Sequence, residues 1–229
     1  LLLDETVVFQ DPHTSGFGLF GGMDNGSITN LTIDNAQLRI QNSGTTALNN
    51  IGILSGYMSS SFLNNVSVKN SSIDIYSGPN ISNVGGISGS VGYMGYIQEV
   101  SSENNSITVR GVAANSSHQS SQVGGVFGNM NWNDKRADIS KIYSTNVSID
   151  LARRAEHVGG LIGRAEYLFW YEGNNGENYS MNEVYAENFE IRITEDTKTN
   201  WNWSSSIGGL IGSTYEQDNG PIKTPELQN

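Results

Sequence analysis

The chain has 229 residues and a formal net charge of -11, so it would be repelled by a phosphate backbone or an anionic lipid surface. It contains no cysteine, which excludes disulfides, cysteine-ligated zinc and thiol chemistry. No apolar run approaches the ~18 residues of a membrane span, and the abundance of glycine, asparagine and serine favours turns and short strands over helices. Nucleic-acid binding and membrane insertion are therefore not expected.

The first predicted element lies in residues 1–16. Val7 and Phe9 alternate with polar or smaller residues, as in the last strand of a repeat. We interpret residues 1–16 as the end of a preceding coil or as an N-terminal edge strand.

From Phe17 onward a glycine block recurs six times, in the pattern apolar-Gly-x-apolar-x-Gly; "HVGGLIG" (157–163) and "SIGGLIG" (206–212) are two of its copies. The first glycines are 34, 33, 39, 35 and 49 residues apart, and they are Gly18, Gly52, Gly85, Gly124, Gly159 and Gly208. A recurring period of this size is typical of repeat architectures.

A second block follows each glycine block, as in "LNNVSVKNSSIDI" (63–75), and its apolar residues alternate around an asparagine. Asparagine tolerates the left-handed conformation at a bend, and stacked copies can form a hydrogen-bonded ladder. The recurring asparagines are Asn35, Asn70, Asn104, Asn146, Asn188 and, in a weaker match at 222–229, Asn229.

The short alternating runs have the period of a strand with one buried face, and no helical period persists. A repeat of three short strands cannot bury a core alone, whereas stacked repeats share one apolar column. We predict an all-β, right-handed parallel β-helix of about six coils, with loop insertions in coils four and five. The alternative, a propeller, requires four antiparallel strands in each unit. The whole chain, 1–229, is one solenoid domain with repeats at about 17–50, 51–83, 84–122, 123–157, 158–206 and 207–229, the last incomplete.

The "VGGLIG" block, followed by a block of the form "IxNVxVxN", resembles the GLUG-motif repeats of bacterial adhesins and of surface regions of IgA-specific peptidases. The resemblance covers the chain from about Phe17 to Asn229. It implies an extracellular, surface-attached bacterial protein with a β-helical stalk, and it implies no catalytic residues. The longer loops of repeats four and five depart from the family pattern.

No catalytic constellation is visible in the sequence. The glycine blocks lack the following GK[ST] and helix of a phosphate loop, so their glycines are interpreted as structural. His13, His118 and His157 have no partner at metal-ligand spacing. Glu183, Glu187 and Glu190 fall on outward slots, where charges prevent sideways strand pairing. No cofactor is expected; the Asp-Asn-Gly turns in 23–26 and 217–220 are the only weak indication of calcium.

All four tryptophans lie in three irregular stretches, at 129–138, 164–180 and 194–206. The first two leave the coil at the same slot and should therefore be neighbours. Aromatic rings among Asn, Asp and Glu are typical of sugar- or protein-binding surfaces, although the rings also suit packing against one another. The candidate binding residues are Trp132, Tyr167, Phe169, Trp170, Tyr171, Trp201 and Trp203.

The two ends of the chain are out of phase by one strand, which suits either a piece of a longer array or end-to-end stacking into a filament. We therefore expect a non-enzymatic, extracellular structural or adhesive repeat domain of a bacterial surface protein. It is expected to act as a rigid spacer, with a glycan, a host or neighbouring surface protein, or another copy as partner. The alternative is a carbohydrate-active β-helix enzyme, a lyase or glycosidase, or its carbohydrate-binding domain.

Overall fold

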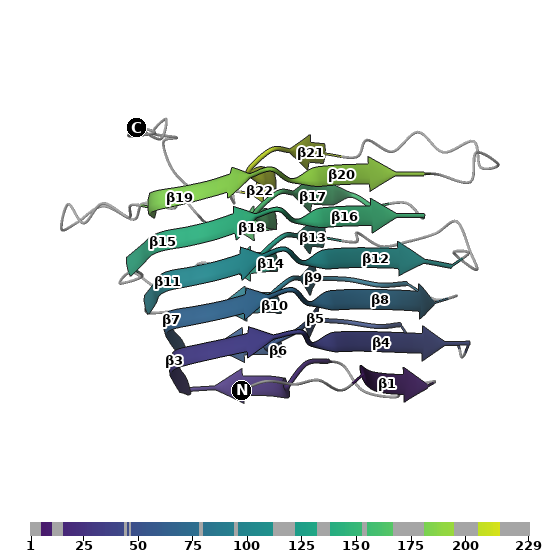
Figure 1. Cartoon of the computed structure of the whole chain (residues 1–229), viewed down its shortest axis with the longest axis horizontal. Coiled ribbons are helices and arrows are strands. Elements are labelled where there is room, and N and C mark those ends of the chain that lie inside the picture. Colours follow the sequence, from purple (N-terminus) through teal and green to yellow (C-terminus); the bar gives the residue numbers. More distant parts are fainter. Residues whose placement is uncertain are drawn as a thin grey trace.

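The protein is a right-handed parallel β-helix, as predicted from the sequence. The computed structural model describes residues 6–10, 16–43, 45, 47–77, 80–93, 96–111, 122–131, 138–152, 155–166, 181–194 and 206–215. Their strands form four parallel sheets that stack along one axis (Figure 1). The chain crosses the front from left to right, returns behind, and climbs from the N-terminal to the C-terminal end, which makes the winding right-handed.

The four sheets are named A to D. Sheet A contains β3 (Ser27–Asp34), β7 (Phe62–Lys69), β11 (Tyr96–Glu103), β15 (Asp138–Thr145) and β19 (Met181–Glu187). Sheet B contains β1 (Thr6–Gln10), β4 (Gln37–Asn42), β8 (Ser72–Ser77), β12 (Ser106–Arg110), β16 (Ser148–Leu151) and β20 (Glu190–Ile193). Sheet C contains β5 (Ile51–Gly52), β9 (Val84–Gly85), β13 (Gln122–Gly124), β17 (His157–Gly159) and β21 (Ser206–Gly208). Sheet D contains β2 (Phe20–Asp24), β6 (Ser55–Ser59), β10 (Ser88–Gly92), β14 (Phe127–Asn131), β18 (Ile162–Glu166) and β22 (Ile211–Tyr215).

Coils two to five therefore contain four strands each, and the sequence-based expectation of three was wrong. The glycine block does not form one strand, because the chain bends between its two glycine-containing halves. In coil two, β5 ends at Gly52 and β6 begins at Ser55, with a bend at Ile53 and Leu54 between them. The block thus supplies a strand to sheet C and another to sheet D.

The N-terminal strand β1 belongs to sheet B. It pairs in parallel with β4, with Val7 opposite Leu38 and Phe9 opposite Ile40. Residues 6–10 therefore occupy the position of the last strand of a coil beneath coil one.

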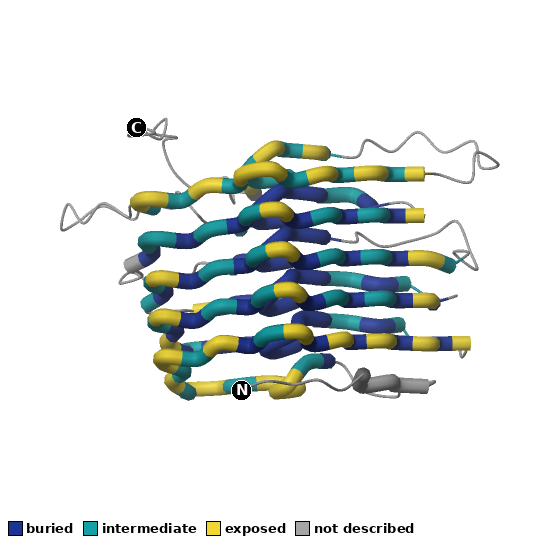
Figure 2. The backbone as a smooth tube through the Cα atoms, in the orientation of Figure 1, coloured by how far each residue is buried: buried dark blue, intermediate teal, exposed yellow. Residues whose placement is uncertain are grey.

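The core is a continuous apolar column inside the coils. Buried and exposed positions alternate along the strands (Figure 2), as in β8, where Ile73 and Ile75 are buried and Tyr76 is exposed. Parallel pairing keeps like positions above one another, so that Ile107 lies between Ile73 and Ile149. Burial of such columns in every coil is the main stabilising contribution, since one coil alone has no closed core.

Sheet A contains a bulge, which explains why its buried apolar residues depart from the two-residue period of a regular strand. Leu63 and Val66 are both buried although they are three positions apart, which a regular two-residue period does not allow. Asn65 between them has a φ of 54°, and this left-handed residue takes up the extra position. The same conformation recurs in the other coils at Asn30, Glu99, Lys141 and Glu183.

Three inward positions per coil compensate one another in volume. They are the residue after the sheet C glycine, the last inward residue of sheet A and the residue after the recurring asparagine. Coil two has Ile53, Val68 and Ser71, whereas coils three to five have a glycine at the first position and a small residue at the second. In those coils the third residue is larger, and the sets are Gly86, Ser102 and Asn105; Gly125, Ser144 and Val147; and Gly160, Ala186 and Phe189. A close-packed interior requires such matching.

The polar members of these sets differ in how well they are hydrogen-bonded. Asn105 Nδ2 donates to Ser102 Oγ at 2.8 Å and to the Val68 carbonyl at 2.9 Å. Ser144 holds the Ser102 position in the next coil, but Val147 replaces the asparagine, and the buried Ser144 Oγ has no hydrogen-bond partner. Ser144 is thus an orphaned hydroxyl in the core.

Candidate functional site

The six repeat glycines occupy positions where the backbones of neighbouring strands leave no room for a side chain. A Cβ on Gly124 would lie 2.0 Å from the Phe127 carbonyl oxygen, and a Cβ on any of the six would lie within 2.5 Å of a backbone oxygen. Because these glycines lie in strands or bends of the stack, their amides face neighbouring coils; the Gly52 amide, for example, donates to the Phe17 carbonyl at 3.0 Å. A phosphate cradle needs amides that are free and convergent, which this arrangement does not provide.

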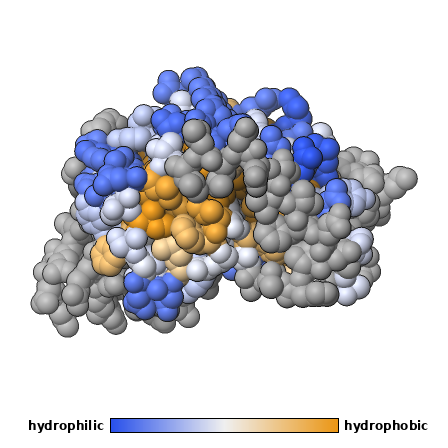
Figure 3. Space-filling view, turned by 60° about the horizontal axis from the view of Figure 1, so that its bottom comes forward, coloured by the Kyte–Doolittle hydropathy of each residue, from blue (hydrophilic) through white to orange (hydrophobic). Residues whose placement is uncertain are grey.

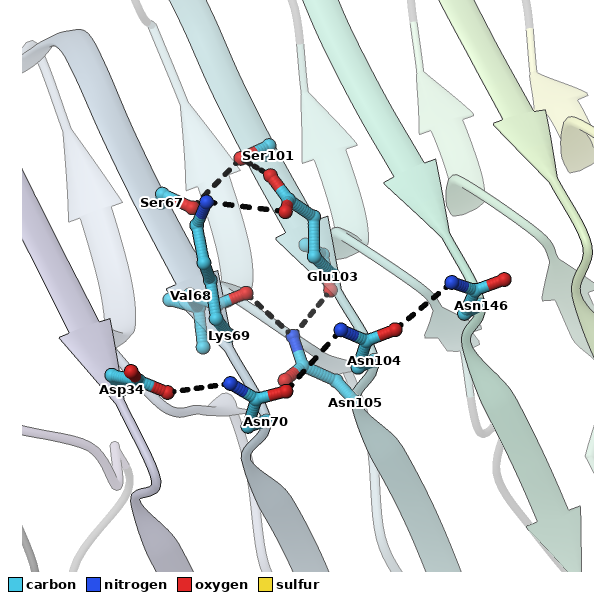
Figure 4. Close-up of polar contacts among 11 residues, drawn as sticks. Asp34, Ser67, Val68, Lys69, Asn70, Ser101, Glu103, Asn104, Asn105 and Asn146 are labelled. Carbon is cyan, nitrogen blue, oxygen red and sulfur yellow. Dashed lines mark hydrogen bonds and ion pairs between the residues drawn. The ribbon is translucent and has the colours of Figure 1, made fainter.

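The recurring asparagines form a ladder at the bend between sheets A and B (Figure 4). Asn35, Asn70, Asn104, Asn146 and Asn188 all have φ values between 49° and 59°, and all are exposed. The amides of the three central asparagines donate toward the N-terminal end: Asn146 Nδ2 to Asn104 Oδ1 at 2.9 Å, and Asn104 Nδ2 to Asn70 Oδ1 at 3.2 Å. Asn70 Nδ2 then donates to the Asp34 carboxylate at 2.8 Å, not to Asn35. Asn229 lies outside the described residues.

The outer face of sheet A carries a second ladder at the bulge. Asn65 Nδ2 donates to Asn30 Oδ1 at 2.8 Å, and two coils further on Lys141 Nζ forms an ion pair with Glu99 at 3.0 Å. The hydrogen bond to Glu99 raises the pKa of Lys141, and Glu183 adds to the effect. Glu183 is exposed beside this pair. An exposed charge at this position keeps the outer face of the sheet solvated.

The other candidate carboxylates also point to solvent. Glu187 and Glu190 are exposed, and Glu190 contacts Arg192 at 2.6 Å. Among the residues that the structure describes, no three histidine, aspartate or glutamate side chains converge as a metal-binding group.

His157 is the one histidine within the described part of the chain, since His13 and His118 lie outside it. It stands at the start of β17, with Gln122 opposite in coil four. Burial, reinforced by the nearby Arg164, lowers the pKa of His157 below its ordinary value of 6.5. Its Nδ1 is buried without a hydrogen-bond partner, so the ring behaves as a neutral residue of the coil wall.

All seven candidate binding aromatics lie outside the described residues: Trp132, Tyr167, Phe169, Trp170, Tyr171, Trp201 and Trp203. The strands that flank them are nevertheless placed. The chain passes from sheet D to sheet A after Asn131 in β14 and after Glu166 in β18, and these two residues are opposite one another. The stretch with Trp201 and Trp203 instead follows sheet B, after β20, and so belongs to another corner.

The structure reveals an aromatic set that was not predicted from the sequence. Phe62, Tyr93 and Tyr96 lie at the bend between sheets D and A in coils two and three, and Tyr57 points outward from β6 just before it; we call these four residues the aromatic corner. Tyr57, Phe62 and Tyr93 are 39%, 49% and 49% exposed. In later repeats, the same position between a sheet D strand and a sheet A strand corresponds in the sequence to residues 132–137 and 167–180. A prediction that located the bend between sheets D and A in the sequence would have grouped these four residues.

A separate aromatic pair lies on the outer face of sheet A. The rings of Tyr143 and Tyr185 stack with centroids 4.4 Å apart and an interplanar angle of 29°. Burial in this stack and the neighbouring Glu183 raise the pKa of Tyr143. The pair occupies the slot of the hydrogen-bonded Ser67 and Ser101 in coils two and three, so it continues a side-chain column.

The chain matches no family model, and the comparisons with curated proteins and with solved structures found no match either. The resemblance to GLUG-motif repeats therefore remains an expectation. In the described ranges, no helix is present that would be long and apolar enough to cross a bilayer.

Proposed function

We propose that this chain is a non-enzymatic, rigid β-solenoid segment of an extracellular bacterial surface protein. The observation that carries the proposal is the in-register stacking of four sheets over successive coils, reinforced outside by amide ladders and inside by one apolar column. Each coil advances the chain by ~4.8 Å, so the stack holds its two ends apart at a fixed distance. The segment acts as a spacer, and it presents aromatic residues to a glycan or a protein at the bend between sheets D and A.

The rigidity can be measured directly, because a chain without cysteine accepts spin labels at introduced cysteines alone. Arg39 and Arg192 are exposed and lie in one column of sheet B, four coil steps apart. Labels at Arg39→Cys and Arg192→Cys should give one narrow distance distribution near ~19 Å plus the label arms. A broad distribution would refute the spacer. The release of new reducing ends from polysaccharides would refute the non-enzymatic assignment.

End-to-end association is part of the proposal. Apolar side chains gather at the N-terminal end of the solenoid (Figure 3), where Leu19 and Phe20 are exposed and Met23, Ile28 and Leu31 are partly buried. Among the described strands, β1 is the last of sheet B at this end, so one of its edges is open to parallel pairing with a second copy. Sedimentation velocity of the chain with and without residues 1–13 tests this, and assembly that survives the deletion would refute it.

A further inference from the structure

We propose that the aromatic corner binds an uncharged polysaccharide chain by stacking its rings on the sugar faces. The inference deepens the proposed function, because it names the ligand class for the same bend of the solenoid. The proposed binding surface consists of Tyr57, Phe62, Tyr93, Tyr96 and the polar residues beside them.

Tyr96 lies opposite Phe62 in the parallel pairing of β11 and β7, so the two side chains leave the same slot in consecutive coils. Consecutive coils are ~4.8 Å apart, so the two side chains start one above the other along the axis. Tyr57 stands in sheet D, on the other side of the same bend, opposite Gly22, where a Cβ would lie 3.6 Å from Tyr57 Cδ1, an ordinary van der Waals contact. The corner thus presents aromatic faces over two coils.

Tyr93 has a φ of 52°, and the residues at its slot in the two coils below are Asn25 and Ser60, with φ values of 53° and 47°. Asparagine adopts this left-handed conformation readily, whereas a bulky aromatic residue does not. A strained residue that exposes half of a tyrosine side chain suits a contact role better than a folding role.

The described residues 55–68, 88–93 and 96–98, which include the corner, contain no charged side chain. The charged residues paired with them in the flanking coils are acidic: Asp24 is opposite Ser59, and Asp138 is opposite Tyr96. The whole chain carries a net charge of -11. Amides stand beside the rings instead: Asn64 and Gln98 are paired across coils two and three, and Gln98 accepts a hydrogen bond from the Tyr96 hydroxyl. Aromatic faces next to amides and hydroxyls, without a cation, fit a ligand that is apolar on one face and hydroxylated at its edge. An uncharged sugar chain has this character, and an anionic polymer would be repelled by the surrounding charge.

Native gel electrophoresis in gels that contain a polysaccharide tests the inference. The probes are hydroxyethylcellulose, mannan and laminarin, with alginate as the anionic comparison. The variants are Tyr57→Ala, Phe62→Ala and Tyr93→Asn, the last of which restores the residue type of Asn25 and so protects the fold. Tyr76→Ala is the matched control, because Tyr76 is 58% exposed but lies on sheet B.

At least one uncharged probe should retard the parent chain, and each corner variant should weaken this binding roughly three- to tenfold. Tyr76→Ala should leave the retardation unchanged. The inference is overturned if no uncharged probe retards the chain, if alginate retards it more strongly, or if Tyr76→Ala weakens binding as much as the corner variants do. A corner that binds only a protein would also overturn it.

The two proposals fail separately. The label distance between positions 39 and 192 depends on coil stacking and not on the corner. A narrow distance without polysaccharide binding would therefore overturn this inference alone, and binding with a broad distance would overturn the spacer alone.

Discussion

Replacing Ser144 with alanine should stabilise the protein, although serine-to-alanine changes in a well-bonded core destabilise it. Ser144 Oγ is buried without a partner, and an unsatisfied buried hydroxyl costs ~1–3 kcal/mol. Alanine removes this cost, and Ala186 already fills the same slot in the next coil. We expect the free energy of unfolding to rise by ~1 kcal/mol, or about 2–4 °C in Tm for a chain of this length.

Ser102→Ala is the matched control in the neighbouring coil. Its Oγ accepts a hydrogen bond from Asn105 Nδ2 at 2.8 Å, so the substitution leaves a buried N–H unpaired. We expect a loss of ~1–2 kcal/mol. Urea unfolding of both variants, followed by circular dichroism, measures the two changes against the parent. Equal destabilisation by both variants would refute the reasoning, since it would show that Ser144 Oγ is hydrogen-bonded, for example to a buried water.

Three further perturbations follow from the described contacts. Gly124→Ala should destabilise the protein by more than ~3 kcal/mol, because its Cβ would lie 2.0 Å from a carbonyl oxygen, whereas Gly92→Ala, with nothing within 4 Å, should be nearly neutral in thermal unfolding. Asn104→Ala should cost about 1–2 kcal/mol, through the lost ladder bonds and the left-handed backbone; urea titration of Asn104→Gly, which keeps that backbone accessible, should show a smaller loss, and equal losses would contradict the backbone contribution. Because the pKa of His157 is lowered on folding, the stability from its neutral form is complete above its unfolded value of 6.5 and falls as pH decreases toward the folded pKa. The variant His157→Gln carries the residue type of Gln122, which lies opposite position 157 in the neighbouring coil. Its melting curves should lack this pH dependence, and a retained dependence would point to other groups.

Sequence periodicity predicted the winding of the chain because each of its signals has a direct physical meaning. The recurring asparagine requires a bend, and the alternation of Ile73 and Ile75 requires a buried strand face. The division of the glycine block into two strands was not predictable from alternation, because Ile53 and Leu54 at the bend are apolar and buried, as are Ile51 and Met58 in the two strands that the bend joins.

The candidate site was less accessible from the sequence. Tyr57, Phe62, Tyr93 and Tyr96 belong to ordinary repeats, and nothing in their spacing distinguishes an outward aromatic from an inward one until the bend between sheets D and A is placed. The bulge at Asn65 has a similar explanation, since the three-residue spacing from Leu63 to Val66 does not by itself indicate a left-handed residue between them.

The volume matching inside each coil has a consequence for how such an array can grow. Gly86, Ser102 and Asn105 fit one another, and all three fall within a single segment that begins with the glycine block. Gene duplication of a segment that starts at Val84 would copy a complete, self-consistent filling of the coil. A duplication that started at Tyr96 would separate Ser102 and Asn105 from Gly86 and would combine them with the corresponding glycine of the neighbouring coil. The glycine block is thus the natural boundary of the unit in which arrays of this kind lengthen or shorten.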